Sequence, residues 1–342
     1  MTLPETELVR VLDQDGRFTP SPAAEQYLSL IEAISDAELE QFYRDMVVIR
    51  AIDTQATNLQ RQGQLALWPP SRGQEAAQVG SARAARAQDT LFPSYREHAV
   101  TRIRGVDPVD IIKLMRGVSH GGWDPTDPKN GNTRLYTLVL GSQVLHAAGF
   151  AMGLNFDGRS GTGDLDTDEA VIVYYGDGAS SQGDVHEAMV FAASYQAPTV
   201  FFLQNNHWAI SVPVSTQSRV PLVERSAGYG IPSVRVDGND VLASYAVSRV
   251  ALDEARSGGG PRAIEAVPTV SARTPPATTP RSTAAPTKSS HGRSATRSIA
   301  CARSWRTGER PGSSSPMWMP RRQTPPKTCV RAASNSGRPP QT

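Results

Sequence analysis

The chain has 342 residues, of which 39% are hydrophobic and 20% are charged, and its formal net charge is +2. This length and apolar content allow two or three domains with a buried core. No run of about 18 apolar residues occurs, so no membrane-spanning helix is expected. The first 16 residues, MTLPETELVRVLDQDG, are acidic and contain no apolar stretch typical of a signal peptide, so we expect a cytoplasmic protein.

The small net charge conceals two regions of opposite charge. Residues 268–342 hold 13 of the 35 Lys and Arg residues but one acid, Glu309, which leaves 22 basic and 32 acidic residues for 1–267. Both cysteines, Cys301 and Cys329, also lie in 268–342, and two such isolated cysteines indicate neither a disulfide framework nor a metal site. Interpreted literally, 268–342 is a basic, disordered arm of the kind that contacts nucleic acid.

The first third of the chain is predicted to be mainly helical. Residues 1–35 form an N-terminal extension in this interpretation, and a long helix follows over 36–63. Its apolar face consists of Leu39, Phe42, Met46, Val47 and Ile49. A second helix is expected over 71–87, and 89–96, DTLFPSYR, is expected as a short strand followed by a loop.

The middle of the chain alternates between strands and helices. A helix is expected from about Ser142, and the continuous apolar run 170–175, AVIVYY, predicts a strand buried on both faces. Another helix (182–195) and another buried strand (199–204) follow, and the segment 231–267 continues with strand, helix and strand. This alternation predicts an α/β fold with a parallel sheet and helices on both of its faces.

Two short polar motifs follow the two buried strands. Gly176-Asp177-Gly178 comes after the first strand, Asn205-Asn206 comes after the second, and 26 residues separate them. Ligands of parallel sheets collect at the carboxyl ends of strands, and glycine lets the backbone approach a ligand closely. Each motif alone is more often a plain turn or strand end. Together they predict a Mg²⁺ site that holds a diphosphate, with Asp177, Asn206 and a carbonyl near Trp208 as ligands.

The chain resembles the α subunit of the E1 component of 2-oxoacid dehydrogenase complexes over about 36–267. The resemblance rests on RQGQLALWPPSRGQEAAQVG, LFPSYREHAV, LVLGSQVLHAAG, the GDG…NNHWAIS segment and RVDGNDV. It implies the α/β fold that binds thiamine diphosphate with Mg²⁺. Members decarboxylate a 2-oxoacid and pass its acyl group to a lipoyl domain of the E2 component. They work as α₂β₂ heterotetramers, in which the β subunit supplies the glutamate that activates the cofactor.

The resemblance also assigns site residues. Tyr95 and Arg96 match the pair that contacts the diphosphate, and Leu140 and Gly141 match the loop that supports the bent cofactor. The complete cofactor set is Tyr95, Arg96, Leu140, Gly141, Gly176, Asp177, Gly178, Ala179, Asn206 and Trp208. Of these, Asp177, Asn206 and the Trp208 carbonyl would hold Mg²⁺. A lone histidine is more often structural than catalytic, but His120 and His146 are the better candidates for lining the site.

The chain departs from the family pattern after Val267. The family continues with a loop like GAHTTSDD, which carries a functional histidine, whereas this chain continues with SARTPPATT. The codons compatible with 268–283, read one nucleotide earlier, are compatible with TYRLGAHTTSDDPTKYR. We therefore expect a single-nucleotide frameshift near the codon of Val267, which makes 268–342 an out-of-frame, disordered tail. Loss of the loop histidine and of the helices that pack on the β subunit would impair both chemistry and assembly.

Three classes of function remain open from the sequence. The first is the α subunit of a thiamine diphosphate-dependent, lipoamide acyl-transferring dehydrogenase. We expect pyruvate as its substrate, with a branched-chain 2-oxoacid or acetoin as the alternative. The sequence discriminates weakly between these substrates, because the acyl pocket is shared with the β subunit. The second is a non-catalytic remnant that keeps the diphosphate half of the site. The third, a nucleic-acid binder that uses the basic tail, is the least favoured.

Overall fold

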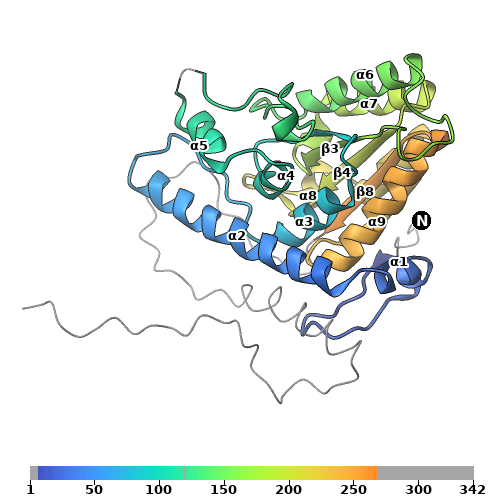
Figure 1. The fold of residues 1–342 in the computed structure, drawn as a ribbon, viewed down its shortest axis with the longest axis horizontal. Helices are drawn as coiled ribbons and strands as arrows, with labels where there is room; N and C mark the ends of the chain where they lie inside the picture. The colour runs from blue at the N-terminus through green and yellow to red at the C-terminus, as the bar shows by residue number, and fades with distance from the viewer. Residues whose placement is uncertain (1–6, 119, 268–342) are drawn as a thin grey trace, which may run out of the picture.

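The fold is built on a six-stranded parallel sheet with strand order β1-β7-β8-β4-β3-β2 (Figure 1). The computed structural model describes residues 7–118 and 120–267, so the predicted out-of-frame tail, 268–342, lies outside the described residues. The strands of this sheet are β1 (Leu8–Val9), β2 (Thr90–Phe92), β3 (Val171–Gly176), β4 (Thr199–Gln204), β7 (Ser233–Asp237) and β8 (Arg262–Val267). The predicted α/β fold with a parallel sheet is confirmed.

The two central strands form where the apolar runs predict them. In β3 only Gly176 is not fully buried, and all six residues of β4 are buried. The two strands pair in parallel from Val171 with Thr199 to Gly176 with Gln204. Because both strands end at the same level, the motifs that follow them meet at one edge of the sheet.

Helices cover both faces of the sheet (Figure 1). The described helices are α1 (Leu28–Glu32), α2 (Asp36–Arg61), α3 (Glu75–Ala84), α4 (His98–Ile103), α5 (Pro108–Arg116), α6 (Ser142–Phe156), α7 (Gly183–Ser194), α8 (Val214–Gln217) and α9 (Val241–Glu254). Helices α2, α3 and α9 share one apolar cluster with Ile172 and Tyr174 of β3. Helices α6 and α7 share the other with Val171, Val173 and Tyr175. Successive β3 residues thus face opposite layers, as the pleat of a strand requires.

The long helix α2 begins at a capping box. The Ser35 hydroxyl accepts from the Glu38 backbone N–H, and the Glu38 carboxylate accepts from the Ser35 N–H. Four residues of the predicted apolar face are buried, namely Leu39, Phe42, Met46 and Ile49. Val47, which the sequence pattern places on the same face, is 45% exposed, because the buried stripe of α2 follows the other four residues.

The segment before α2 packs on the same core. Strand β1 pairs with β7 at the edge of the sheet, and Ile31 and Ile34 are buried in the cluster beneath α9. The Asp240 carboxylate caps α9 by accepting from the N–H groups of Leu242 and Ala243, and it also accepts from Val11 and Leu12 at 2.7 Å each. The residues from 7 to 35 that the sequence sets apart as an extension therefore share the core of the α/β unit.

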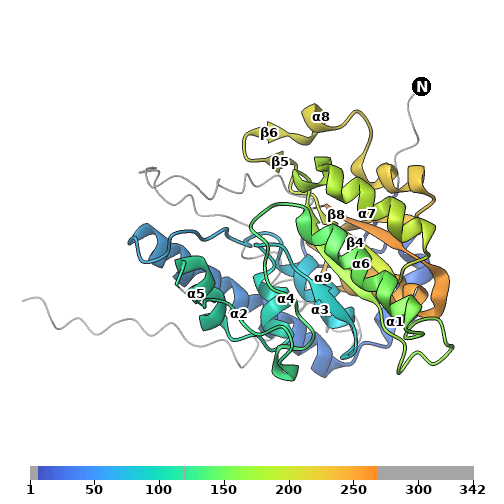
Figure 2. The same cartoon turned by 90° about the horizontal axis from the view of Figure 1, so that it is seen from above.

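A small hairpin stands beyond the carboxyl edge of the central strands. It consists of β5 (Trp208–Ala209) and β6 (Val212–Pro213), and α8 follows it directly. Figure 2 shows the hairpin and α8 apart from the helices that cover the sheet. Ile210 at its turn has a φ of 57°, which is rare for a β-branched residue, and its side chain is 79% exposed.

Candidate functional site

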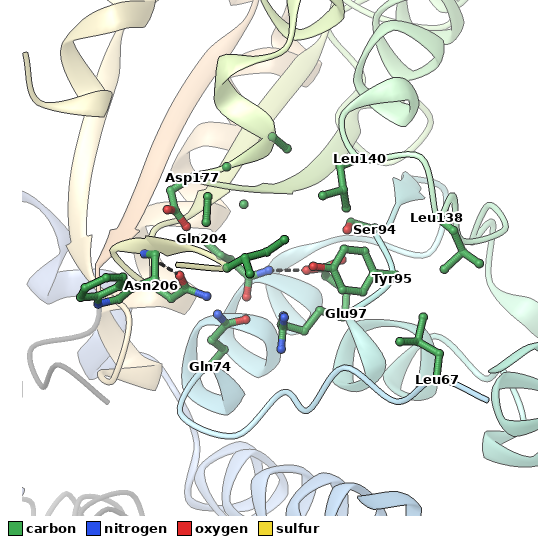
Figure 3. A pocket seen from close by; sticks show the side chains of 17 residues that line it. Leu67, Gln74, Ser94, Tyr95, Glu97, Leu138, Leu140, Asp177, Gln204 and Asn206 are labelled. Carbon is green, nitrogen blue, oxygen red and sulfur yellow. Dashed lines mark hydrogen bonds between the residues drawn. The ribbon is translucent and has the colours of Figure 1, made fainter. Parts of the chain in front are cut away.

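A cleft of ≈ 370 Å³ opens at the carboxyl edge of β3 and β4 (Figure 3). Nine of the ten residues proposed from the sequence to bind the cofactor line it. They are Tyr95, Arg96, Leu140, Gly176, Asp177, Gly178, Ala179, Asn206 and Trp208. Gly141 is the tenth, and it lies at the start of α6 rather than in the wall of the cleft. The fold therefore gathers residues from four separate loops around one cavity.

The polar end of the cleft contains Asp177 and Asn206. Asp177 is 2% exposed, and burial raises the pKa of its carboxyl group above the ordinary value. The Asn206 amide oxygen accepts from the Trp208 backbone N–H at 3.0 Å, which fixes the asparagine beside Asp177 in Figure 3. A Cβ atom on Gly178 would lie 2.8 Å from the Ala209 Cβ, so the turn after β3 needs a glycine to pass under the hairpin.

The donor set restricts the kind of metal that fits here. Within residues 7–118 and 120–267, no group of three or more His, Cys, Asp and Glu side chains could hold a metal ion. Asp177 is the carboxylate at the polar end of the cleft, and the amide oxygen of Asn206 lies beside it. Such a set suits Mg²⁺ that takes its remaining oxygens from phosphate and water. The residues present therefore fit a metal–diphosphate group.

The turn that carries Asp177 is fixed from behind by Arg225, which the sequence analysis does not single out. Its guanidinium donates to the backbone oxygen of Ser180 at 2.9 Å and to the Ser180 hydroxyl at 3.1 Å. The same hydroxyl donates to the backbone oxygen of Asp177 at 2.6 Å. The contact between Arg225 and Ser180 joins η4 (Leu222–Tyr229) to the loop after β3. No short sequence pattern predicts a contact between these two segments.

Arg96 lines the cleft and follows Tyr95 in the chain. Its guanidinium carbon is 5.4 Å from the centre of the Tyr95 ring, and one of its N–H groups donates to the backbone oxygen of Pro70. Its own backbone oxygen accepts from the Gln78 side chain at 3.2 Å. These contacts hold the guanidinium in the cleft, where it can pair with an anion.

Glu97 is a second feature that the sequence analysis missed. The side chain is 2% exposed, and its Oε1 accepts from Gln204 Nε2 at 2.5 Å. Burial is the main reason that the pKa of this carboxyl group rises to about 7. A polar residue that closes a fully buried strand, as Gln204 does, is the sequence signal that could have revealed this pair.

The apolar end of the cleft is formed by Leu67, Tyr95, Leu138 and Leu140 (Figure 3). Behind Leu67, the Trp68 ring stacks on His98 with 4.1 Å between ring centres, and its Nε1–H donates to Asp53. The His98 Nε2–H donates to the backbone oxygen of Pro69 at 3.0 Å, and burial lowers the pKa of this imidazole to about 3. Neutral His98 is thus a structural support for the wall.

The two histidines proposed from the sequence to line the site lie elsewhere. His120 is exposed and has a φ of 59°, and His146 is exposed on α6. Neither side chain lines the cleft of the described chain. Roles for His120 and His146 in the reaction remain predictions.

None of the helices in the described part of the chain is long and apolar enough to span a bilayer.

Comparison with known proteins links this geometry to a family. Residues 43–269 match the family described as Dehydrogenase E1 component. A 3-methyl-2-oxobutanoate dehydrogenase subunit alpha of Mycobacterium tuberculosis is 46% identical over 264 residues, which cover 77% of this chain and 67% of that protein. A pyruvate dehydrogenase E1 component subunit alpha of Staphylococcus aureus is 34% identical over 260 residues, which cover 76% and 65%. The matched region thus spans about two thirds of the length of these relatives.

Solved structures show the same fold at low sequence identity. A transketolase from Pichia stipitis superposes with a TM-score of 0.53 at 18% identity, covering 67% of this chain and 36% of the transketolase. A transketolase from Campylobacter jejuni gives a TM-score of 0.51 at 19% identity, with 66% and 37% covered. The likeness confirms that the sheet and its helices follow an architecture found in transketolases.

Proposed function

Because the chain belongs to the dehydrogenase E1 component family, we propose that it is the α subunit of a thiamine diphosphate-dependent 2-oxoacid dehydrogenase. The observation that carries the proposal is the meeting of Asp177 and Asn206 at one end of a cleft whose wall holds Tyr95 and Arg96. Carboxylate and amide oxygens suit Mg²⁺, and a guanidinium suits a phosphate. This pairing of groups fits a metal-bound diphosphate better than it fits an uncharged ligand.

The roles of the individual residues follow from their chemistry. Asp177, Asn206 and the backbone oxygen of Trp208 would hold Mg²⁺, and Arg96 would bind a phosphate oxygen. When bound, the cofactor supplies the carbon nucleophile and electron sink that decarboxylation needs, while the protein orients it and excludes water. Leu140 and the apolar end of the cleft would exclude water from the part of the cofactor beyond the diphosphate.

For the substrate, we favour a branched-chain 2-oxoacid over pyruvate, the first choice from the sequence. The relative named for 3-methyl-2-oxobutanoate is 46% identical, against 34% for a relative named for pyruvate. Leu67, Leu138 and Leu140 give the cleft an apolar end that suits an aliphatic group. Each buried methylene is worth about 0.8 kcal/mol. An isopropyl group would therefore gain more at this end than the single methyl of pyruvate.

The partners we propose are a β subunit, which completes the site, and a lipoyl domain, which accepts the acyl group. Leu138 and Ile210 line the cleft and are 55% and 79% exposed, and Val139, next to Leu138 in the chain, is 73% exposed. Exposed apolar groups gathered beside a site are typical of a surface that another chain covers. A β subunit seated on this rim would exclude water from the reacting end of the cofactor.

We also propose that the frameshift near Val267 separates family-like from unrelated sequence. The family match ends at residue 269, next to the end of β8 at Val267 and to the change in composition. The DNA around this codon tests the idea, and a stop codon within a few codons of the shifted frame contradicts it. A chain that keeps the diphosphate half-site but lacks the family loop would be the non-catalytic remnant considered above.

Co-expression with the cognate β subunit tests the proposed function. The chain as written and a variant with the reading frame restored after Val267 are assayed for reduction of an artificial electron acceptor that depends on a 2-oxoacid, thiamine diphosphate and Mg²⁺. We expect activity from the restored chain, with 3-methyl-2-oxobutanoate preferred over pyruvate. Absence of activity from the restored α–β pair with every 2-oxoacid contradicts the proposal. Activity from the chain as written contradicts the remnant interpretation.

A further inference from the structure

Glu97 lies in the middle of the cleft, between its polar and apolar ends (Figure 3). One carboxylate oxygen accepts from Gln204 Nε2, whereas the other, Oε2, is buried and forms no hydrogen bond of normal geometry in the described part of the chain. The backbone N–H groups of Ser94 and of Glu97 itself also favour the charged form, but they do not outweigh burial. Glu97 also forms no ion pair with a basic side chain there. A buried carboxylate in such surroundings is costly, because neither a cation nor a full set of donors replaces its hydration.

Two amide oxygens in the same cleft as Glu97 have no hydrogen-bond donor in the described chain. Gln74 Oε1 and Gln204 Oε1 are buried acceptors that also line the cleft, and neither has a partner in the described chain. A protonated carboxyl group carries an O–H donor that a carboxylate does not. The Gln204 amide can form a hydrogen bond with Glu97 in either its ionised or its protonated state. Rotating the amide by 180° presents its oxygen instead of its nitrogen to Glu97. The cleft is therefore built to accept a proton at this position.

The charged and titratable groups that face Glu97 come from several elements. Arg96, its neighbour in the loop, is the basic group that favours the charged form of Glu97. Tyr174 of β3 and Tyr136 of the segment before α6 both feel the Glu97 charge and have raised pKa values, so they are neutral near pH 7. His98, with its lowered pKa, is neutral as well. Among these groups, Arg96 alone opposes protonation.

A diphosphate in the cleft changes this balance. It brings negative charge that Mg²⁺ cancels only in part, it shares the guanidinium of Arg96, and it displaces water, and each of these effects favours a neutral Glu97. Resting on the proposed function, we infer that Glu97 takes up a proton when the Mg²⁺-bound diphosphate is bound and acts as a neutral positioning residue in the loaded site. The proton comes from solvent and adds to a carboxylate oxygen, and no other bond changes. Glu97 forms no hydrogen bond or ion pair with Asp177, Asn206 or Trp208 in the described chain.

The expected pH dependence follows from the state of the empty cleft. Burial raises the pKa of Glu97 to about 7, so well below pH 7 the group is already protonated and binding takes up no proton there. Above pH 7 the empty site is charged, and uptake approaches one proton per site. Affinity should then fall with rising pH by at most about tenfold per pH unit. The substitution Glu97→Gln keeps the shape of the side chain, removes the uptake and flattens this profile.

Calorimetric titration tests the inference on the native chain, with its reading frame restored after Val267 and its β subunit bound. Thiamine diphosphate with saturating Mg²⁺, and separately inorganic diphosphate with Mg²⁺, are titrated between pH 6.5 and 8.5 in buffers of different ionisation enthalpy. The difference between buffers gives the protons taken up. We expect uptake that grows above pH 7 in the native chain and is lost in Glu97→Gln. It should be kept in Glu75→Gln, which changes a buried glutamate outside the cleft that pairs with Arg50.

Two results overturn the inference while leaving the proposed cofactor intact. One is tight binding by the native chain with no uptake across this pH range, and the other is equal uptake by the native chain and Glu97→Gln. Infrared difference spectra of the native chain give a second measurement if Glu97→Gln does not fold. Loss of a carboxylate band and gain of a protonated carboxyl band on binding are expected, and unchanged bands contradict the inference. If neither ligand binds with Mg²⁺, the proposed cofactor function fails, and this inference fails with it.

Discussion

The two ends of the cleft differ in how completely this chain builds them. At the polar end, Asp177 is 2% exposed, its turn is tied by Ser180 and Arg225, and the hairpin closes over Gly178. At the apolar end, Leu138 and its neighbours reach the surface and are largely exposed. The difference fits our proposals that the polar end binds a diphosphate and that a second chain completes the apolar end. Substitutions at the polar end, behind the apolar wall, at the exposed rim and under the hairpin should therefore have different effects.

The largest effect is expected at the polar end from Asp177→Ala. Loss of the one carboxylate at the proposed Mg²⁺ site should weaken Mg²⁺-dependent binding of thiamine diphosphate by about 100-fold or more. Titration calorimetry at fixed Mg²⁺ measures this. Asp184→Ala, which changes an exposed carboxylate on nearby α7, is the matched control and should leave affinity unchanged. If Asp177→Ala and the native chain bind thiamine diphosphate with equal affinity, Asp177 is not a Mg²⁺ ligand.

The support behind the apolar wall should make stability depend on pH. The pKa of His98 is about 3 in the fold and about 6.5 when unfolded, so the unfolded chain binds more protons between these values. The free energy of unfolding should therefore fall as the pH falls below 6.5, by about 2 kcal/mol at pH 5 from this group. Denaturant unfolding at pH 7 and pH 5 measures the change. The raised pKa values of Glu97 and Asp240 make these two groups add stability over the same range, so the His98 contribution is the difference in pH effect between the native chain and His98→Asn. An equal pH effect in the two chains would contradict the prediction.

The exposed rim should matter for assembly and not for folding. Ile210→Ser removes a large apolar group from the surface proposed to meet the β subunit. We expect association to weaken by about tenfold, a typical cost for one well-placed interface side chain. The melting temperature of the isolated chain should stay unchanged or rise, because the φ of 57° at Ile210 disfavours a β-branched residue. Sedimentation with the β subunit measures the association. Unchanged association would show that Ile210 does not contribute to the interface.

The smallest effect is expected where the hairpin crosses the turn after β3. Gly178→Ala would place a Cβ 2.8 Å from the Ala209 Cβ and force the hairpin to shift. We expect the unfolding free energy to fall by about 1–2 kcal/mol and cofactor affinity to fall several-fold. Gly183→Ala, at the start of α7, meets no atom within 4 Å and should change neither quantity. If the Gly178→Ala chain is as stable as the Gly183→Ala chain, the hairpin can shift without a loss of unfolding free energy, contrary to the prediction.

Sequence patterns predicted the parts of the site that depend on neighbouring residues. Apolar runs gave the positions of β3 and β4, and the turns after them placed Asp177 and Asn206 at one edge. The patterns missed contacts between distant segments. Glu97 and Gln204 are 107 residues apart, and Arg225 reaches Ser180 across 45 residues. Strand β1 was missed because two residues are too few for a periodic signal.

The contacts of Asp240 have a consequence for the order of folding during synthesis. Its carboxylate holds the backbone of Val11, which is 229 residues earlier in the chain. At a synthesis rate of about 5–20 residues per second, the partner of this segment emerges roughly 10–45 s after the segment itself. Until then the first strand has nowhere to dock, and afterwards it closes the edge that β7 would otherwise present to other chains. Strand β1 is thus made before every other strand of the described sheet but can reach its place only after β7 has been made.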